Sequence, residues 1–373
     1  MTKTAMNHRG GVSRGPACPV GAVLAVMLAI IVPKSEAVGT AFVIKNSGVV
    51  LLAKNLDWPV GDGYVFVNKR HVVKEAFGGV SSPPLRWTSE YGSVTFNQFG
   101  REFPLGGINE HGLVIEELSG PAGYPSPDDR PALNELQWIQ YQLDNCRSVK
   151  DVLKSETRLR ISRLLFNFHF LVADRSGKAA VVEFAGGKML SYIGNDLLVR
   201  VLSNSSYEES LRYLRMHKGF GGERSVTGGS ESTERFARAA TILKDFEWPI
   251  QGVLSDHAFT VLRSVEQADT KWSIVYNISR RLVFFKTKSH RRLKVIRLEA
   301  LDFSCASPVL MLPVDTEAGW ILNENFVPYA PQTNRRLLDT VFQKLQELGE
   351  LAKTPAAGLV ETMSEYPATC RCR

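Results

Sequence analysis

The sequence has few cysteines and lacks the short motifs of several enzyme classes. Its 373 residues contain five cysteines, too few for a disulfide framework. Cys146, Cys305, Cys370 and Cys372 show neither CxxC pairs nor the histidine spacing of a zinc site, and their pairing stays open. There is no GxSxG elbow, phosphate-binding loop or dinucleotide fingerprint. These absences argue against serine hydrolases of the elbow type, nucleotide-dependent enzymes and structural zinc proteins.

Long apolar runs are also scarce. The one candidate, Val20–Val32, is shorter than the roughly 20 residues that span a bilayer. A basic stretch precedes it, and Ser35 and Ala37 supply small residues for a signal peptidase. This pattern predicts a signal peptide over residues 1–37, and hence an exported protein, periplasmic or secreted. No stable membrane insertion is expected once it is removed; a retained anchor is the alternative.

The charge is mildly basic and does not indicate a nucleic-acid partner. Part of the net charge of +7 belongs to the leader. The densest basic run, residues 286–294, lies on an expected hairpin and lacks interleaved aromatic residues. We interpret it as a solvated turn. The histidines have no ligand spacing, and neither a metal nor an organic cofactor is implied.

The body of the chain, residues 38–353, reads as one domain, followed by a tail over 354–373 without periodicity that we expect to be mobile. Apolar β-branched runs around Asn46-Ser47-Gly48 predict an opening hairpin. Helical spacing appears at Ala132–Asn145, Ser232–Phe246 and Asn334–Leu351. Further strands are expected at 64–69, 93–98, 113–118, 168–174, 179–184, 188–193, 197–203, 272–276, 282–286 and 293–298. Strands and helices in blocks favour a layered α+β fold.

Several ordered segments carry a family resemblance. They are the hairpin ending in Lys-Asn-Leu-Asp-Trp (54–58), Gly-Gly-Ile-Asn-Glu-His-Gly-Leu-Val (106–114), the helix near 133–143, Val201–Tyr207 with Ser232–Ala239, and Thr270–Tyr276. Together they resemble the choloylglycine hydrolase family, which includes bile salt hydrolases and penicillin V acylases. The resemblance covers roughly residues 39–350. It implies a four-layer αββα sandwich of the N-terminal-nucleophile (Ntn) hydrolase type and hydrolysis of linear amides.

The nucleophile position departs from the family. The family uses a chain-terminal cysteine whose own α-amine acts as base, and its Cys-Thr-x-Phe opening aligns with Gly39-Thr40-Ala41-Phe42. An ungapped alignment fixed at Asp57 places Val38 there instead, and neither residue can attack a carbonyl. Cleavage after Gly39 would leave Thr40 as a terminal nucleophile, although strand alternation would point it away from the cysteine's side. A sequence variant at Gly39 is a third reading.

The remaining machinery of the family has matches in this sequence. The resemblance implies that Asp57 holds the α-amine, that Lys54 replaces an arginine, that Asn204 and the backbone N–H of Ser119 form the oxyanion hole, and that Arg235 lies near the nucleophile. The ordinary alternatives are a turn-capping aspartate, a solvated lysine and turn residues. Arg238, one helical turn later, is expected to be a surface or structural cation. Glu116 and Glu117 alternate on one strand, so only one of them can face a site, and a solvated face is the ordinary expectation.

Two functions follow from these observations. The leading hypothesis is an exported linear-amide C–N hydrolase that acts through an acyl-enzyme, with glycine at the usual cysteine. The alternative is an inactive relative that binds an amide or acyl ligand or a protein partner. Penicillin V, conjugated bile acids and N-acyl homoserine lactones are substrates within the resembling family, and the sequence does not choose among them. The family is often tetrameric, which implies a homo-oligomer, but the sequence leaves this open.

Overall fold

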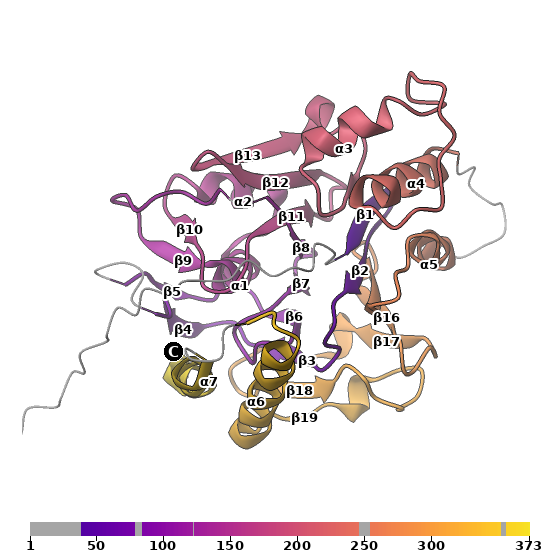
Figure 1. Cartoon of the computed structure of the whole chain (residues 1–373). Helices are drawn as coiled ribbons and strands as arrows, with labels where there is room; N and C mark the ends of the chain where they lie inside the picture. The colour runs from indigo at the N-terminus through magenta and orange to yellow at the C-terminus, as the bar shows by residue number, and fades with distance from the viewer. Residues whose placement is uncertain (1–38, 79–83, 122, 246–253, 352–355) are drawn as a thin grey trace, which may run out of the picture.

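Two antiparallel sheets stacked face to face form the centre of the molecule (Figure 1). The computed structural model describes residues 39–78, 84–121, 123–245, 254–351 and 356–373, so the expected leader lies outside the described residues. The first sheet has six strands in the order β14 (Val201–Leu202), β1 (Thr40–Asn46), β2 (Val49–Asp57), β15 (Thr270–Asn277), β16 (Leu282–Thr287) and β17 (Lys294–Arg297).

The second sheet has nine strands and carries most of the middle of the chain. Its order is β13 (Lys188–Ile193), β12 (Ala179–Ala185), β11 (Phe168–Ala173), β8 (Val114–Ser119), β7 (Gly106–Asn109), β6 (Ser93–Asn97), β3 (Tyr64–Asn68), β18 (Leu310–Pro313) and β19 (Val327–Pro328). Two small sheets join β9 (Ala132–Asn134) to β10 (Arg160–Ser162), and β20 (Arg371–Cys372) to β4 (Val72–Glu75) and β5 (Arg86–Thr88).

Strands from opposite halves of the chain are neighbours in these sheets. β1 pairs with β14, β2 with β15, β3 with β18 and β4 with β20, all antiparallel. The first strands are therefore completed by strands that come more than a hundred residues later.

The opening hairpin forms because its turn residues adopt the required backbone. Ser47 and Gly48 have φ angles of 45° and 79°, as the tight turns of hairpins need. The register that follows places Thr40 opposite Asn55 and Ala41 opposite Lys54. This register decides which side chains at the start of β1 share a face with the end of β2.

Aromatic side chains fill the space between the two sheets. Phe96 of β6 lies 5.4 Å from Phe285, 6.2 Å from Trp272 and 6.3 Å from Tyr276, measured between ring centroids, and those three rings come from the opposite sheet. All four side chains are buried. Such interdigitation of aromatic and aliphatic groups is the main stabilising contact between stacked sheets.

Helices cover the outer faces of both sheets (Figure 1). They are α1 (Glu135–Asn145), α2 (Val149–Ser155), α3 (Tyr207–Leu214), α4 (Ser232–Lys244), α5 (Leu254–Ser264), α6 (Pro331–Glu347) and α7 (Ala356–Glu365). Helices α4 and α5 contact β1, β2 and β15, while α1 contacts β7 and β8. The layers are therefore helix, sheet, sheet and helix, which is the predicted αββα arrangement.

Several expected elements have different bounds in the structure, and two of them show the reason. The helix expected from Ala132 begins only at Glu135, because the Asn134 side chain caps it by accepting from the Gln137 backbone N–H, and the preceding residues form β9. The strand expected over 197–203 shortens to β14. Local capping and pairing decide such boundaries more than hydrophobic spacing does.

The expectation of a mobile tail over 354–373 is wrong for the part that the structure describes. Tyr366 is buried, with its ring 5.6 Å from that of Phe77 and 5.4 Å from that of Phe103. Cys372 forms a disulfide with Cys305, and β20 pairs with β4. The tail has no apolar periodicity, but it supplies an aromatic anchor and a covalent link, which hold it against the domain.

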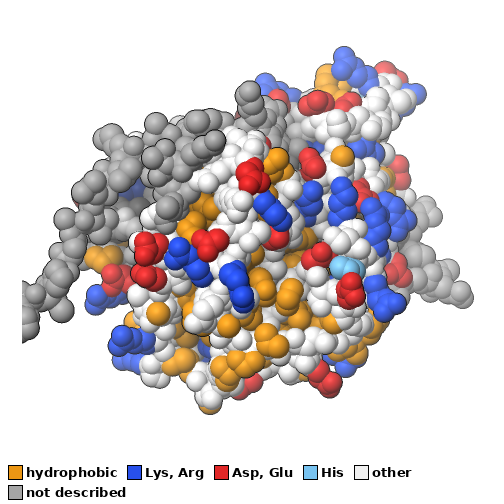
Figure 2. Space-filling model, turned by 60° about the horizontal axis from the view of Figure 1, so that its bottom comes forward, with side chains coloured by type: hydrophobic (Ala, Val, Ile, Leu, Met, Phe, Trp, Pro, Cys, Tyr) orange, Lys and Arg blue, Asp and Glu red, His pale blue; other side chains and the backbone are white. Residues whose placement is uncertain are grey.

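Charged and apolar side chains are both spread over the face shown in Figure 2. In Figure 2, Lys and Arg side chains gather on the right of the face shown, the side on which α5, β16 and β17 lie in Figure 1. In the described part of the chain, no helix is both long and apolar enough to cross a membrane.

Candidate active site

The start of β1 lies between the helix layer and the space between the sheets. Thr40 is fully buried, and its partner in the register is Asn55, whose amide donates to the backbone oxygen of Leu262 in α5 at 2.8 Å. Opposed residues of an antiparallel pair share a face. Thr40 therefore faces the helices, and Ala41, the next residue of β1 and the partner of Lys54, faces the other sheet, as strand alternation requires.

Gly39 has a backbone that excludes a side chain. Its φ angle is +138°, and a Cβ built on it would lie 2.1 Å from the backbone oxygen of Asn55 and 3.8 Å from Cε of Lys54. A contact of 2.1 Å is far inside van der Waals distance. The position that aligns with the family's cysteine is thus shaped for glycine in this chain.

Arg235 is the centre of the site. Glu231 and Glu234 form a capping box at the start of α4, which fixes the first turn and aims Arg235 inward. The side chain is 1% exposed. Its guanidinium donates to Gly39 O at 2.8 Å, Thr40 Oγ1 at 2.8 Å, Asp57 Oδ2 at 3.3 Å, Asn204 Oδ1 at 2.8 Å and Ser230 O at 3.1 Å. Four of the site residues expected from the sequence meet at this one side chain.

Asn204 and Ser119 lie beside each other, as their expected shared role requires. Asn204 Nδ2 donates to the backbone oxygen of Ser119 at 3.1 Å, while its Oδ1 accepts from Arg235. Arg235 thereby fixes which end of the amide points toward Ser119. An amide NH₂ has two hydrogens, so the second can donate to a substrate oxygen.

Asp57 is buried at the end of β2 and is held by two donors. Thr270 donates to Oδ1 at 2.5 Å and Arg235 to Oδ2 at 3.3 Å. Burial raises the pKa of Asp57 to about 6, while the Thr270 hydrogen bond and the charge of Arg235 act in the opposite direction. Its carboxylate is therefore charged near neutral pH and becomes neutral in mild acid. Thr270 was not expected from the sequence, because its contact depends on the register between β2 and β15.

Lys54 lies on the other face of β2, between the sheets. Its ammonium is 2.7 Å from Glu117 Oε1 and 3.1 Å from Glu116 Oε2, and Tyr276 donates to Glu116. All four side chains are buried. Burial alone would lower the pKa of Lys54, but Glu117 and Glu116 together raise it, so the ammonium stays charged. It contacts none of Thr40, Asp57 or Arg235 within salt-bridge or hydrogen-bond distance in the described residues.

The expectation of a solvated face for Glu116 and Glu117 is therefore wrong. Both carboxylates are buried because a long lysine side chain reaches them from the facing sheet, and period-two alternation could not reveal that partner. Burial raises the pKa of Glu117 to about 7, against the opposing charge of Lys54.

A small pocket adjoins this arrangement at Ser119. It is lined by Leu56, Trp58, Gln98, Phe99, Leu105, Glu117, Ser119, Phe166 and Phe168, and its open volume of about 10 Å³ is near the room that one water needs. Within the described part of the chain, Trp58 Nε1, Gln98 Oε1 and Glu117 Oε2 are buried without a hydrogen-bond partner. Unpaired buried polar atoms are costly, so this mostly apolar pocket is suited to a group that carries polar atoms.

The other residues singled out in the sequence have structural roles. Arg238 donates to the backbone oxygens of Ser264, Thr227 and Gly229, as expected of a structural cation. Among the described residues, no group of three or more His, Cys, Asp or Glu side chains could hold a metal ion.

Comparison with known proteins identifies the family and the fold. The model of the family described as "Linear amide C-N hydrolases, choloylglycine hydrolase family" matches residues 40–311. A penicillin V acylase of Pectobacterium atrosepticum is 28% identical over 186 residues, which cover 45% of this chain and 49% of that protein. The match thus spans about half the length of this curated relative.

Solved structures share the fold over most of their length. The penicillin V acylase of Agrobacterium tumefaciens superposes with a TM-score of 0.67 at 26% identity, covering 78% of this chain and 98% of that one. A variant of the conjugated bile acid hydrolase of Clostridium perfringens gives a TM-score of 0.61 at 16% identity, covering 75% and 98%. These matches confirm the predicted αββα fold.

Proposed function

The chain belongs to the choloylglycine hydrolase family of linear amide C–N hydrolases, and we propose that it hydrolyses a linear amide after export. The nucleophile in this proposal is Thr40, freed by cleavage after Gly39. The observation that supports it is the contact of Thr40 Oγ1 with Arg235, the side chain that also holds Asp57 and Asn204.

Cleavage would change the site in a useful way. It removes the Gly39 carbonyl that accepts a hydrogen bond from Arg235, and it creates the α-amine of Thr40 at the same place. This amine would lie close to the carboxylate of Asp57, which also accepts from Arg235. A chain-terminal residue is no longer held on its amino side, so Thr40 can turn about its Cα–C bond. That rotation would bring the hydroxyl from the helix face toward the pocket beside Ser119.

The chemistry then follows from the groups present. The Thr40 hydroxyl oxygen attacks the amide carbonyl, and its proton passes to the neutral α-amine, whose ordinary pKa lies near 8. The oxyanion accepts from Asn204 Nδ2 and a backbone N–H of Ser119. The C–N bond breaks as the ammonium protonates the leaving amine. Water then hydrolyses the acyl ester and restores Thr40.

The pocket beside Ser119 would take the acyl group of the substrate. Aromatic and aliphatic side chains make up most of its wall, while the unpaired atoms of Trp58, Gln98 and Glu117 call for a polar substituent. Its present volume requires those side chains to move apart for a larger group. Penicillin V and conjugated bile acids, which the names of the relatives mention, are the first amides to assay.

Export is part of the proposal. Stable disulfides persist in oxidising compartments, and the Cys305–Cys372 bond supports a periplasmic or secreted protein from which residues 1–39 have been removed. A homo-oligomer, as is common in the family, is proposed with it and is open to analytical ultracentrifugation.

The test is the mature terminus together with turnover. Mass spectrometry of the exported protein is expected to find Thr40 as the first residue, and the protein is expected to release amine from at least one linear amide. A terminus at Met1, or one that leaves Gly39 in place together with no turnover, contradicts the proposal.

A second function is favoured by Gly39 itself. Because the backbone there has no room for a Cβ, the site suits an amide-binding protein without catalysis. The Gly39→Cys variant, processed so that the introduced cysteine is its first residue, separates the two functions. If the natural chain binds amides without turnover and the variant hydrolyses them, binding is the function. Turnover by the natural chain excludes it.

A further inference from the structure

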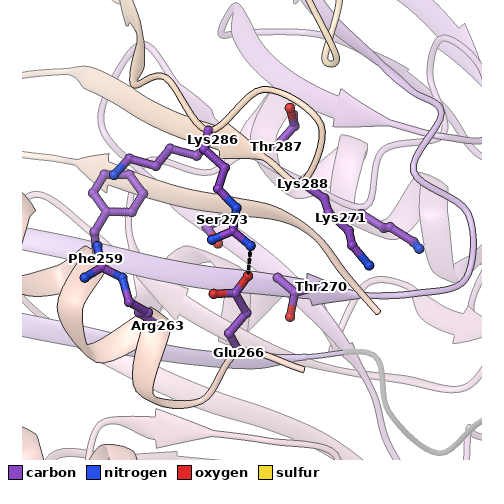
Figure 3. Close-up of a pocket in the computed structure, with 10 residues that line it drawn as sticks. Phe259, Arg263, Glu266, Thr270, Lys271, Ser273, Lys286, Thr287 and Lys288 are labelled. Atoms are coloured by element: carbon purple, nitrogen blue, oxygen red, sulfur yellow. Dashed lines mark hydrogen bonds and ion pairs between the residues drawn. The ribbon is translucent and has the colours of Figure 1, made fainter. Parts of the chain in front are cut away.

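A second cavity adjoins Thr270, the residue that donates to Asp57 (Figure 3). It has a volume of about 220 Å³ and is lined by Phe259, Arg263, Glu266, Thr270, Lys271, Ser273, Lys286, Thr287, Lys288 and Arg291. These residues come from α5, the turn after it, β15, β16 and the loop that follows β16. None of them lines the pocket beside Ser119, so the two cavities are separate.

Positive charge dominates the lining. Five of the lining side chains are Lys or Arg, and Glu266 is the only carboxylate among them. Glu266 pairs with Arg291 at 2.9 Å, the dashed line in Figure 3. Lys288 donates to the backbone oxygen of Ala268 at 2.6 Å. The lining thus carries more cations than it can neutralise.

Arg263 and Lys286 form the unbalanced end of the cavity. Figure 3 shows both next to Phe259, and the Lys286 ammonium lies 4.5 Å from the centre of that ring. Among the residues that the structure describes, neither has a carboxylate within 4.0 Å. Arg263 is exposed and Lys286 is half-buried, so a ligand from solvent can reach both.

The electrostatics favour an anion at this end. Burial lowers the pKa of Lys286, Arg263 and Arg291 lower it further, and only Asp256 opposes them. Like charges held close together in a partly buried site repel, and an anion between them relieves that repulsion. An arginine fork beside a lysine is the usual recognition of a tetrahedral oxyanion.

The hydroxyl groups of the lining are already used. Ser273 donates to Asn55, Thr287 to Asp315 and Thr270 to Asp57. Recognition in this cavity therefore rests on the cations, which discriminate by charge more than by shape. This favours a dianion over a neutral or singly charged ligand.

We propose that this cavity is a binding site for a small tetrahedral dianion, such as sulfate, phosphate or a phosphate monoester. Arg263 and Lys286 hold it, and Arg291 joins them by exchanging Glu266 for the ligand. The basic run at residues 286–294, which the sequence suggests is a solvated turn, supplies two of these three cations.

Sulfate is the sharpest probe, because it does not titrate near neutral pH. Isothermal titration of the full chain at constant ionic strength is expected to show saturable binding with one site. The Arg263→Gln/Lys286→Gln double variant is expected to lose at least tenfold in affinity. Lys188→Gln, which replaces an exposed lysine on β13 at the edge of the other sheet, is the matched control and should stay within twofold.

A variant of opposite sign makes the test stricter. Glu266→Gln removes the competing carboxylate and is expected to strengthen sulfate binding several-fold, which a loss of folding cannot imitate. Absence of saturable binding by the natural chain, or equal weakening by Lys188→Gln, overturns the proposal.

The phosphate group could belong to a free metabolite or to a lipid headgroup. Co-sedimentation with phosphatidate vesicles, beside titration with glycerol phosphate, distinguishes these sources. Binding of glycerol phosphate that depends on Arg263 supports the small-molecule site, and binding to vesicles alone overturns it. Neither readout involves amide turnover, so the outcome is independent of the proposed hydrolysis.

Discussion

Two buried cations flank the end of β2 and behave differently. Arg235, on the helix side, shares its donors among three backbone or amide oxygens, one hydroxyl and a single carboxylate. Lys54, between the sheets, forms ion pairs with two carboxylates, those of Glu116 and Glu117. The first cation organises neutral groups around the chain position where chemistry is expected, and the second neutralises charges.

The partners of a buried cation indicate whether it belongs to a functional site. A buried ion cluster such as Lys54–Glu116–Glu117 needs all its members. Among the described residues, the one oxygen of this cluster without a hydrogen-bond partner is Oε2 of Glu117, which lines the pocket beside Ser119. Arg235 instead touches Gly39, Thr40 and Asn204, whose arrangement would change with processing or substrate. The resemblance assigned both cations to the site, and the geometry shows that they have different partners.

The largest expected effect lies on the Arg235 side. Thr40→Ala removes the proposed nucleophile and is expected to lower kcat/KM for a linear amide by at least about 10⁴-fold, as loss of a nucleophile commonly does. The melting temperature should change little. Thr362→Ala, which replaces an exposed threonine of α7, is the control. Retention of a tenth of the activity by Thr40→Ala would rule out this residue as the nucleophile.

On the Lys54 side the expected effect is on stability. Lys54→Met leaves Glu116 and Glu117 buried without a cation and is expected to lower the free energy of unfolding by about 3–5 kcal/mol. Denaturant titration measures it. Adding Glu116→Gln and Glu117→Gln should recover part of the loss. Arg335→Met, which breaks the exposed pair with Asp339, should cost less than about 1 kcal/mol.

The pH dependence sharpens the comparison further. The pKa of Asp57 is raised from 3.8 to about 6, so the fold favours its neutral form. Its contribution to stability is present below about pH 4 and is lost as the pH rises through about 6. We expect the stability difference between the natural chain and Asp57→Asn to change by up to about 3 kcal/mol across that window. If the stability difference between the two proteins does not change with pH, Asp57 does not titrate with a raised pKa in the folded protein.

The smallest effect is expected at Ser119. Its proposed role rests on the backbone, and its side chain donates no hydrogen bond within the described residues. Ser119→Ala is expected to change kcat/KM by less than about twofold, whereas Asn204→Ala should cost about 10²–10³-fold, as for other oxyanion-hole donors. Steady-state kinetics of both variants decides whether the side chain or the backbone matters.

The sequence was informative where chemistry is local. The hairpin, the helix that carries Arg235 and the fold class all follow from turn residues, periodicity and family resemblance. The register between β2 and β15, which brings Thr270 to Asp57, depends on strands more than two hundred residues apart and leaves no local signal. The pairing of Glu116 and Glu117 with Lys54 also leaves no local signal in the sequence, because Lys54 belongs to the facing sheet.

The sequence also could not predict that the tail is ordered or that a basic cavity forms, because both depend on residues that are distant in the sequence. Tyr366 and Cys372 stabilise the end of the chain through Phe77, Phe103 and Cys305, none of which is near in sequence. The basic run suggested a solvated turn because Arg263, on α5, lies outside it. Single contacts of high sequence separation therefore decided what periodicity could not.

The pairing of the first strands with strands from the second half of the chain also decides when the sheets can form during folding. Strands β1, β2, β3 and β4 pair with β14, β15, β18 and β20, respectively, so these contacts join segments far apart in the sequence. Such topologies fold slowly, since loop closure precedes the stabilising contacts. A growing chain therefore exposes unpaired strand edges until its second half has been synthesised. The same delay suits the export proposed above, because a chain without its completed sheets is still unfolded when translocation would occur.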